Sequence, residues 1–413
     1  MKIKSLELEN FRGIVNHKVY FDPVLTVFAG RNGGGKSTIL EAIAIMLSWI
    51  PVRIGYDIKA EKIKDSDITF GRDFSRLELE LESRGGLMTL KMYKRAGRKN
   101  SAETGGMSAA LDYGRQMRVS LDANKNSDLE LPVFAFYRSN RNGRGAPFPD
   151  SSTRDTVYKN AFFAGTDFAK FSRGFAKALA ARSAEMREAS SMPLKKGNLR
   201  RVEISQKYLW LDSIRWALEA FLPTHYVFRE SCGKLYVKDI PAECLSEGEK
   251  TVIALIADIA MRMVVANPYS RNHLSAKAIV LVDELDIHLH PDWQAAIAKK
   301  LPQIFPNAQF IISSHSPSVL SVAPSLYKID GDIRGTQIQH VESTFGREPS
   351  DILATVMNAK RDESVGERLK KLYSLIDRRK FNEASRLLAD LHEMLPDDPE
   401  LVRADYLIRA LNS

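Results

Sequence analysis

The sequence predicts an α/β protein: a mixed sheet with flanking helices, an inserted basic helical arm and a small helical C-terminal tail. Three observations predict this fold. In 24–49, an apolar run of strand length is followed by a glycine-rich turn and then by apolar residues at helical spacing. Two further apolar runs, 278–282 and 309–313, end in polar side chains, as the buried strands of parallel sheets do. Helical periodicity dominates 151–222 and 345–413.

The N-terminal residues predict two strands ahead of the glycine-rich turn. Residues Lys2–Glu9 alternate apolar and polar side chains, and Lys18–Phe21 forms a second short run. Between them lies a turn, 10–13, that contains Arg12. We expect these elements to place Arg12 near whatever the glycine-rich turn binds.

The glycine-rich turn has the pattern of a phosphate-binding loop. Glycines let backbone N–H groups close on phosphate oxygens, and helix onset at Lys36 adds the positive end of the helix dipole. Lys36 supplies a cation for the β and γ phosphates, and Ser37 offers its hydroxyl to Mg²⁺. The alternative, a glycine turn beside a surface lysine, is disfavoured by the strand before the turn and the helix after it. The expected nucleotide-binding residues here are Arg12, Gly30, Arg31, Asn32, Gly33, Gly34, Gly35, Lys36, Ser37 and Thr38.

The next hundred residues predict strands separated by one long loop. Residues 76–93 alternate leucines with charged side chains on both sides of a Gly-Gly pair, which predicts a hairpin. Residues 95–113 are rich in Gly, Ser, Lys and Arg without a period, and they predict a mobile basic loop. A short strand is expected at 119–121 and a buried strand at 132–137.

A helical insertion is predicted over 151–222, and part of it is strongly basic. Between Lys170 and Arg201 there are nine Lys or Arg residues against two acids. Residues 225–239 then predict a hairpin, and a long apolar helix is expected to begin after Leu245.

Two polar motifs can be interpreted structurally or chemically. Ser246 with Glu249 three residues later is a capping box, and alone it does not distinguish a helix cap from a phosphate clamp. The strand 278–282 ends in Asp283 and Glu284. Buried carboxylates are costly, so they are usually paired or bound to metal. Asp283 is therefore expected to reach Mg²⁺, and Glu284 to polarise a water molecule against the γ phosphate.

A histidine follows the next predicted strand. His315 lies directly after 309–313, within Ser314-His315-Ser316. Histidines after core strands are more often structural than catalytic. Because this one lies one strand beyond the acid pair, a γ-phosphate sensor is the favoured interpretation.

In their order along the chain, these motifs resemble those of the ABC-type ATPases, in the branch of RecF, SMC, Rad50 and OLD-like proteins. GRNGGGKST is similar to Walker A, LSEGEK to the ABC signature, IVLVDE to Walker B, LDIHLHP to the D-loop region and SSHSP to the H-switch. The opening LELENFRG is typical of the same branch. Two features depart from the pattern. The segment 137–142 has no Q-loop glutamine, and the interval between Walker A and the signature is longer than a transporter subunit needs.

The resemblance implies an ATP-hydrolysing enzyme that works as a homodimer or higher oligomer, with two ATP molecules sandwiched head to head. Glu284 would be the general base, Lys36 would bind phosphate charge and His315 would contact the γ phosphate. Asp286 would communicate across the dimer. The remaining implied ligands are Ser37 and Asp283 for Mg²⁺, and Ser246, Glu247 and Gly248 as the clamp donated to the partner's ATP.

The whole chain also resembles the ATPases of Septu and retron anti-phage defence systems, through RNGGGKSTILEAIAIMLSW, FYRSNRN and the compact helical tail. Those ATPases work with a separate HNH nuclease, so the resemblance implies an ATPase subunit that controls a nuclease partner. The alternative is a RecF-like ATPase of DNA repair and recombination. An OLD-type ATPase-nuclease is less favoured, because the sequence has no HNH motif and no clustered acids after the H-switch.

Charge and composition bound the other partners. The net charge of +9 is modest, so only the basic stretches 91–118 and 170–201 argue for nucleic acid, against the alternative of solvated helix faces. We expect DNA contact that is independent of sequence. No run reaches eighteen apolar residues and no signal core opens the chain, which predicts a cytoplasmic protein without a membrane partner. Cys232 and Cys244 are expected to be free thiols.

Four segments are expected on this interpretation. They are an ATPase N-lobe with Walker A (1–150), a helical insertion or arm (151–222), a C-lobe with signature, Walker B, D-loop and H-switch (223–335), and a C-terminal helical segment (336–413).

Overall fold

The computed structural model forms two compact units, Met1–Ile352 and Leu353–Ser413. The strand β14 (Gly335–Val341) belongs to the first unit, so the boundary expected between residues 335 and 336 falls within this strand. Each unit is described by itself. The structure describes all residues except 84, 98–101, 124–128, 142–144, 147, 150–153, 333–334, 342–346, 348–350, 353–354, 357–362, 397 and 413.

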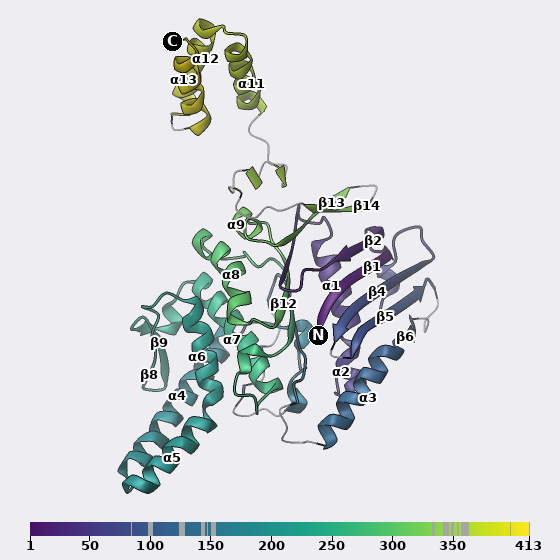
Figure 1. Ribbon diagram of the computed structural model, residues 1–413, viewed down its shortest axis with the longest axis vertical. Helices are drawn as coiled ribbons and strands as arrows, with labels where there is room; N and C mark the ends of the chain where they lie inside the picture. The colour runs from purple at the N-terminus through teal and green to yellow at the C-terminus, as the bar shows by residue number, and fades with distance from the viewer. Residues whose placement is uncertain are drawn as a thin grey trace. The chain divides into compact units, whose positions relative to one another are not determined.

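A six-stranded mixed sheet is the centre of the first unit (Figure 1). Five strands run parallel, and only β14 is antiparallel. In spatial order the strands are β14, β13 (Ser325–Asp332), β3 (Leu25–Gly30), β12 (Ala308–Ser313), β11 (Ala278–Val282) and β7 (Val133–Tyr137). Every residue of β3, β12, β11 and β7 is buried, which confirms the expected core strands. Their carboxyl ends lie at one edge of the sheet.

A second, antiparallel sheet lies in the same unit. Its strand order is β2 (Ile14–Tyr20), β1 (Lys2–Phe11), β4 (Phe74–Ser83), β5 (Gly86–Arg95) and β6 (Ala102–Gly106). The expected hairpin is confirmed by the pairing of Ser83 with Gly86. Burial alternates along β4, as the alternating sequence predicts.

Two expectations between β5 and β7 are wrong. The segment predicted as a loop over 95–113 contains β6 and the start of helix α3 (Ser108–Ala123), and the strand predicted at 119–121 is part of the same helix. The reason is the small size of the residue at the closest contact. Helix α3 packs on α2 (Trp49–Ile54) through Gly114, where a Cβ atom would lie 2.2 Å from the carbonyl oxygen of Arg53. Such a close approach needs no large apolar residues, so the helical period is weak in the sequence.

Helices flank the central sheet. They are α1 (Lys36–Leu47), α7 (Glu247–Ala266) and α8 (Pro291–Ile304), with the short α9 (Pro317–Leu320) packed on α8; α3 packs on β5 of the second sheet. Short 3₁₀ helices lie at Asp65–Asp67, Arg154–Thr156, Ala161–Phe163, Ala242–Cys244 and His273–Ser275. The stretch Lys36–Ile54 is long and apolar enough to cross a membrane by length and composition, and 67% of its most apolar window is buried in the protein. Core helices pass the same test, and this burial accounts for the apolar composition.

The helical insertion is confirmed as three helices: α4 (Phe168–Ser191), α5 (Leu194–Lys207) and α6 (Leu209–Phe221). Helices α4 and α5 run side by side and form the arm (Figure 1). The expected hairpin follows as β8 (Phe228–Ser231) and β9 (Lys234–Val237), with β10 (Ile240–Pro241) completing a small sheet. The expected apolar helix is confirmed as α7, in which every residue from Val252 to Ala266 is buried.

The second unit contains three amphipathic helices: α11 (Glu363–Asp377), α12 (Phe381–Met394) and α13 (Pro399–Asn412). They share a core of their own, formed by Leu369, Leu372, Ile376, Ala384, Leu388, Leu391, Leu401, Ala404 and Ile408. The tail is therefore a small helical unit, as the apolar spacing predicts.

Candidate active site

The glycine-rich loop joins β3 to α1 and adopts backbone conformations that require glycine. Gly30 has a φ of 150°, and a Cβ atom there would lie 1.9 Å from the carbonyl oxygen of Ile329. Gly35, directly before α1, has a φ of 110°. Arg31, Asn32 and Gly33 form the exposed rim of the loop. The loop therefore presents backbone N–H groups and the amino end of α1 to solvent, which is the geometry that binds phosphate.

Lys36 is buried at the base of this loop. Its Nζ donates hydrogen bonds to the carbonyl oxygens of Gly30 (2.8 Å) and Arg31 (3.0 Å). Burial lowers the pKa of Lys36, and the nearby carboxylates, Asp283 foremost, oppose that shift. Among the described residues, the hydrogen bonds of the ammonium group go to these neutral carbonyls, so it can exchange them for phosphate oxygens.

The acid pair lies at the end of the neighbouring strand β11, next to the loop. The carboxylate of Asp283 accepts hydrogen bonds from the hydroxyl groups of Ser37 (2.7 Å) and Ser313 (2.5 Å). These hydroxyl and carboxylate oxygens are the hard donors that Mg²⁺ prefers, so Ser37 and Asp283 fit the expected metal ligands. Ser313 was not predicted as a site residue. The signal in the sequence was a hydroxyl group at the end of an otherwise apolar strand.

Glu284 follows in a conformation that is rare for a glutamate, with a φ of 50°. Its backbone N–H donates to the Ser313 hydroxyl (2.7 Å), and the N–H of Leu285 donates to the Ser313 carbonyl (3.0 Å). The two strand ends are thereby tied together at the point where Glu284 leaves the sheet.

His315 and Asp286 also meet at this edge. The backbone N–H of His315 donates to both carboxylate oxygens of Asp286, at 3.2 and 3.3 Å, so Asp286 contacts the H-switch of its own chain. Burial, together with the charge of Lys36, lowers the pKa of His315. The ring is therefore neutral at pH 7. Its Nε2 atom is buried and has no hydrogen-bond partner among the described residues.

The signature residues begin helix α7. Ser246 is exposed and caps the helix: its N–H donates to the Glu249 carboxylate (2.8 Å), and the N–H of Glu249 donates to the Ser246 hydroxyl (3.3 Å). Burial opposes ionisation of Glu249, but hydrogen bonds from Lys238 and Tyr226 lower its pKa to about 2. Glu249 is thus charged at neutral pH, and the helix start is fixed while the serine faces solvent.

Gly248 and Glu247 lie beside the segment that follows the acid pair. A Cβ atom on Gly248 would lie 2.6 Å from the carbonyl oxygen of His288, so the signature turn requires a glycine there. Glu247 is exposed and forms an ion pair with Lys250 (2.8 Å). The signature and the segment after Walker B therefore pack directly on each other within one chain.

Arg12 lies beside α1, among charged partners. Its guanidinium pairs with Glu41 of α1 and with Asp67 (2.9 Å). Arg138 also pairs with Glu41 (3.0 Å). Together these residues line a pocket of about 240 Å³. The hydrogen bonds of Arg12 thus connect it to α1 rather than to the glycine-rich loop.

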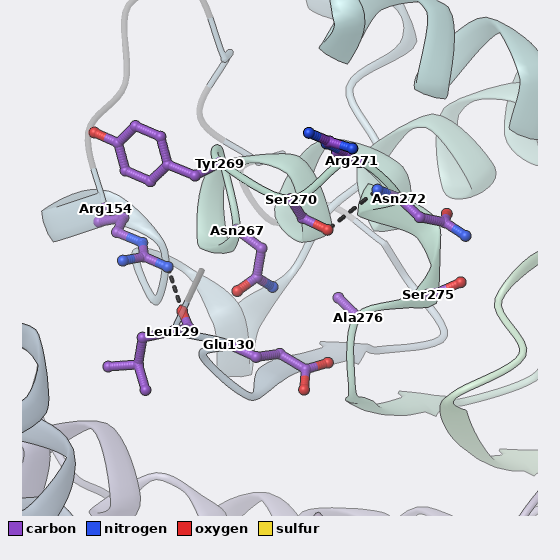
Figure 2. A pocket seen from close by; sticks show the side chains of 10 residues that line it. All are labelled: Leu129, Glu130, Arg154, Asn267, Tyr269, Ser270, Arg271, Asn272, Ser275 and Ala276. Atoms are coloured by element: carbon purple, nitrogen blue, oxygen red, sulfur yellow. Dashed lines mark hydrogen bonds between the residues drawn. The ribbon is translucent and has the colours of Figure 1, made fainter. Parts of the chain in front are cut away.

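A larger pocket, of about 510 Å³, is shown in Figure 2. It lies at the edge of the central sheet opposite to the acid pair. Arg154 in its wall donates to the carbonyl oxygen of Leu129. Glu130 accepts from the backbone N–H of Lys277 (2.8 Å), one residue before β11 begins. This pocket is therefore at the amino ends of the strands, about 15 Å along a five-residue strand from the acid pair. It is separate from the nucleotide site.

Comparisons with known proteins identify the family of this chain. A family model described as "AAA domain" matches residues 5–220, and one described as "AAA domain, putative AbiEii toxin, Type IV TA system" matches residues 235–321. The chain is 30% identical to the retron Vc95 probable ATPase of Vibrio cholerae, over 86% of this chain and 79% of the relative.

Two further relatives cover most of the chain. The retron Ec83 probable ATPase of Escherichia coli is 25% identical over 77% of this chain and 69% of the relative. The Septu protein PtuA of Bacillus thuringiensis is 26% identical over 86% of this chain and 84% of the relative. The chain therefore belongs to the family of AAA-domain ATPases that includes the retron ATPases and Septu protein PtuA, and its reaction is ATP hydrolysis.

Proposed function

We propose that this protein is the ATPase subunit of a bacterial anti-phage defence complex, in which two copies close on two ATP molecules and control a separate HNH nuclease in the cytoplasm. The observation that carries the proposal is the similarity to a retron ATPase along 86% of the chain, combined with a site in which phosphate loop, acid pair and H-switch lie together.

Each residue of the site has a defined task in this proposal. Lys36 binds the phosphate charge, and Ser37 with Asp283 holds Mg²⁺, which supplies further charge neutralisation when bound. Glu284 accepts a proton from the attacking water, and the neutral His315 contacts the γ phosphate through its unpaired nitrogen. Positioning and charge stabilisation provide most of the catalysis in phosphoryl transfer, so rigid strand ends suit the reaction.

The proposed dimer is supported by two surfaces that each chain exposes. The rim of the phosphate loop is exposed, and so is Ser246 at the amino end of the 20-residue helix α7. The in-chain hydrogen bonds of Ser246 go to Glu249 rather than to the loop. A helix amino end that faces solvent can bind the γ phosphate of a partner, and an isologous dimer would form two such sites.

DNA contact is proposed for the arm, defined here as α4 and α5. Several of its cations are neutralised locally, as in the pairs Arg182–Asp212 and Lys207–Glu185. Seven exposed cations have no acidic partner among the described residues: Lys170, Arg173, Lys177, Arg187, Lys195, Lys196 and Arg201. By contrast, Lys91, Lys94 and Arg118 of the other basic stretch are paired with acids. The arm is thus the favoured surface for phosphate backbone.

Reversing the charge of two arm lysines is expected to lower the affinity for DNA and to make that affinity less dependent on salt concentration. The double variant Lys195→Glu/Lys196→Glu should lose about tenfold or more in affinity for duplex DNA of any sequence, and its slope of log K against log salt should fall by about 2. Fluorescence anisotropy over a salt series measures both. Lys370→Glu/Lys371→Glu, the same change on exposed lysines of α11, is the control and should bind normally. Binding by the arm variant that equals the control would remove the arm from the DNA surface.

The partner is tested by purification from the native host. A tagged chain expressed at its natural level should copurify with a stoichiometric smaller polypeptide, and mass spectrometry should identify an HNH motif in it. The same tag on the Lys36→Ala variant shows whether association depends on ATP. Copurification of DNA-repair proteins without any nuclease would instead favour the RecF-like alternative.

A further inference from the structure

Arg141 lies in the segment that follows β7, at the same sheet edge as the acid pair. It has a φ of 42°, and its side chain is more than nine-tenths buried. The backbone is fixed on both sides: its N–H donates to the carbonyl of Arg138 (3.0 Å), and its carbonyl accepts from the N–H of Thr166 (3.3 Å). The guanidinium group therefore starts from a well-anchored position.

The side chain of Arg141 reaches two consecutive backbone carbonyl groups, those of Glu284 and Leu285. Its Nη2 donates to the carbonyl oxygens of Glu284 (2.9 Å) and Leu285 (3.3 Å). Glu284 is in the left-handed region, which is unfavourable for a glutamate and persists only where neighbours fix it. Ser313, at the end of β12, holds the N–H of Glu284, and Arg141, in the segment after β7, holds its carbonyl, so the two ends of this residue are fixed by different parts of the chain.

Stabilising the fold does not by itself explain why a charged arginine is buried at this position. Burial lowers the pKa of Arg141 to about 10, and the carboxylates of Asp286, Glu284 and Asp283 oppose that shift, so the group stays charged at neutral pH. Its Nε and Nη1 atoms are buried without a hydrogen-bond partner among the described residues. Unpaired buried donors are costly, and sites that keep them usually do so for function.

The segment that carries Arg141 is also tied to the signature helix. The hydroxyl group of Tyr137 donates to Asp258 of α7 (2.6 Å), and the N–H of Ala146 donates to the same carboxylate. Asp258 is paired in turn with Arg262 (2.8 Å), and the backbone N–H of Asp283 donates to the Tyr137 carbonyl (2.8 Å). The segment therefore bridges the strand that bears the acids and the helix that bears the signature.

We propose that Arg141 is a positioning residue for the general base: it holds the backbone at Glu284 and Leu285 in the conformation that presents the Glu284 carboxylate to the attacking water. It lies in the segment where the ABC pattern would have placed a glutamine. The inference rests on the proposed role of Glu284.

The test compares Arg141→Met, Arg141→Lys and Glu284→Gln in single-turnover ATP hydrolysis. Arg141→Met should lower the rate constant about 100-fold, the cost of a misplaced reacting group, while Kd for ATP changes less than about threefold. Arg141→Lys should recover about tenfold of that loss, because an ammonium group can still donate to the two carbonyls. The melting temperature of Arg141→Met should stay within about 4 °C of wild type, since methionine removes the unpaired donors. Arg138→Met, on the same segment, is the control and should keep normal turnover.

A double variant separates positioning from a general loss of structure. In the Glu284→Gln background, Arg141→Met should cost no more than about twofold further, because its effect acts through Glu284. Independent, multiplying defects would overturn the inference, as would normal turnover by Arg141→Met. If Glu284→Gln itself turns over rapidly, the role of Glu284 fails; if only that variant is slow, the role of Arg141 fails alone.

Discussion

Replacing Glu284 with Gln is expected to slow ATP hydrolysis by about a thousandfold and to leave ATP binding within about threefold of wild type. Glutamine keeps the size of the side chain and the backbone contacts with Ser313 and Arg141, but it cannot accept a proton. With hydrolysis blocked, ATP stays between the two heads. The variant should therefore remain a dimer after ATP is added, which light scattering during gel filtration measures alongside phosphate release.

The control for this prediction is Glu243→Gln, the same chemical change on an exposed glutamate shortly before the signature. It should hydrolyse ATP normally and return to the monomer as ATP is consumed. Rapid turnover by Glu284→Gln would remove Glu284 from the role of base. A slow variant that stays monomeric with ATP would leave the base role intact and contradict the ATP sandwich.

The core strands could be predicted because burial on both faces leaves a continuous apolar run in the sequence. Strands β7, β11 and β12 are of this kind. The polar residues directly after such strands are then expected at one edge of a parallel sheet. Asp283 and His315 were predicted on this basis, and the structure places both at that edge with the loop that contains Lys36.

Ser313 and Arg141 were not predicted because their contacts depend on which strands are neighbours. The strand order β3, β12, β11 and β7 is a property of the folded chain, and it brings Ser313 beside Asp283 and Arg141 beside Glu284. Arg141 donates to backbone carbonyls, which any sequence provides. In a segment with several arginines, nothing marks the one whose side chain turns inward.

Helix α3 shows a different limit. Amphipathic periodicity detects helices that bury large apolar residues, whereas the buried residues of α3 are Ala110 and Gly114, and Gly114 makes the close approach to α2. Polar, glycine-containing residues can therefore form a packed helix without an apolar stripe. Strand β14 was difficult to predict for a related reason. It pairs antiparallel with β13 at the edge of the sheet, and only β13 also pairs with a parallel strand, β3.

Mixing two inactive variants provides the sharpest test of the shared site. Lys36→Ala is expected to abolish turnover because the buried cation for the phosphates is lost, and Ser246→Arg because a bulky cation blocks the clamp. In a mixed dimer, one site combines both defects and the other combines the intact loop with the intact signature. Equimolar mixing should therefore restore about a quarter of wild-type turnover if the two sites act independently.

The expected recovery of about a quarter of wild-type turnover requires that Ser246 of one chain act on the ATP bound to the loop of the other chain. Ser246 is exposed, and losing a helix cap costs about 1 kcal/mol, so Ser246→Arg should still fold. If each signature instead acted on the loop of its own chain, every site in the mixture would carry one defect, and mixing would restore nothing. Ser270→Arg, a change at a half-buried residue beyond the far end of α7, should be active alone, which would show that the added arginine is not itself the cause of the loss. Recovery therefore requires that one ATP be held by two chains.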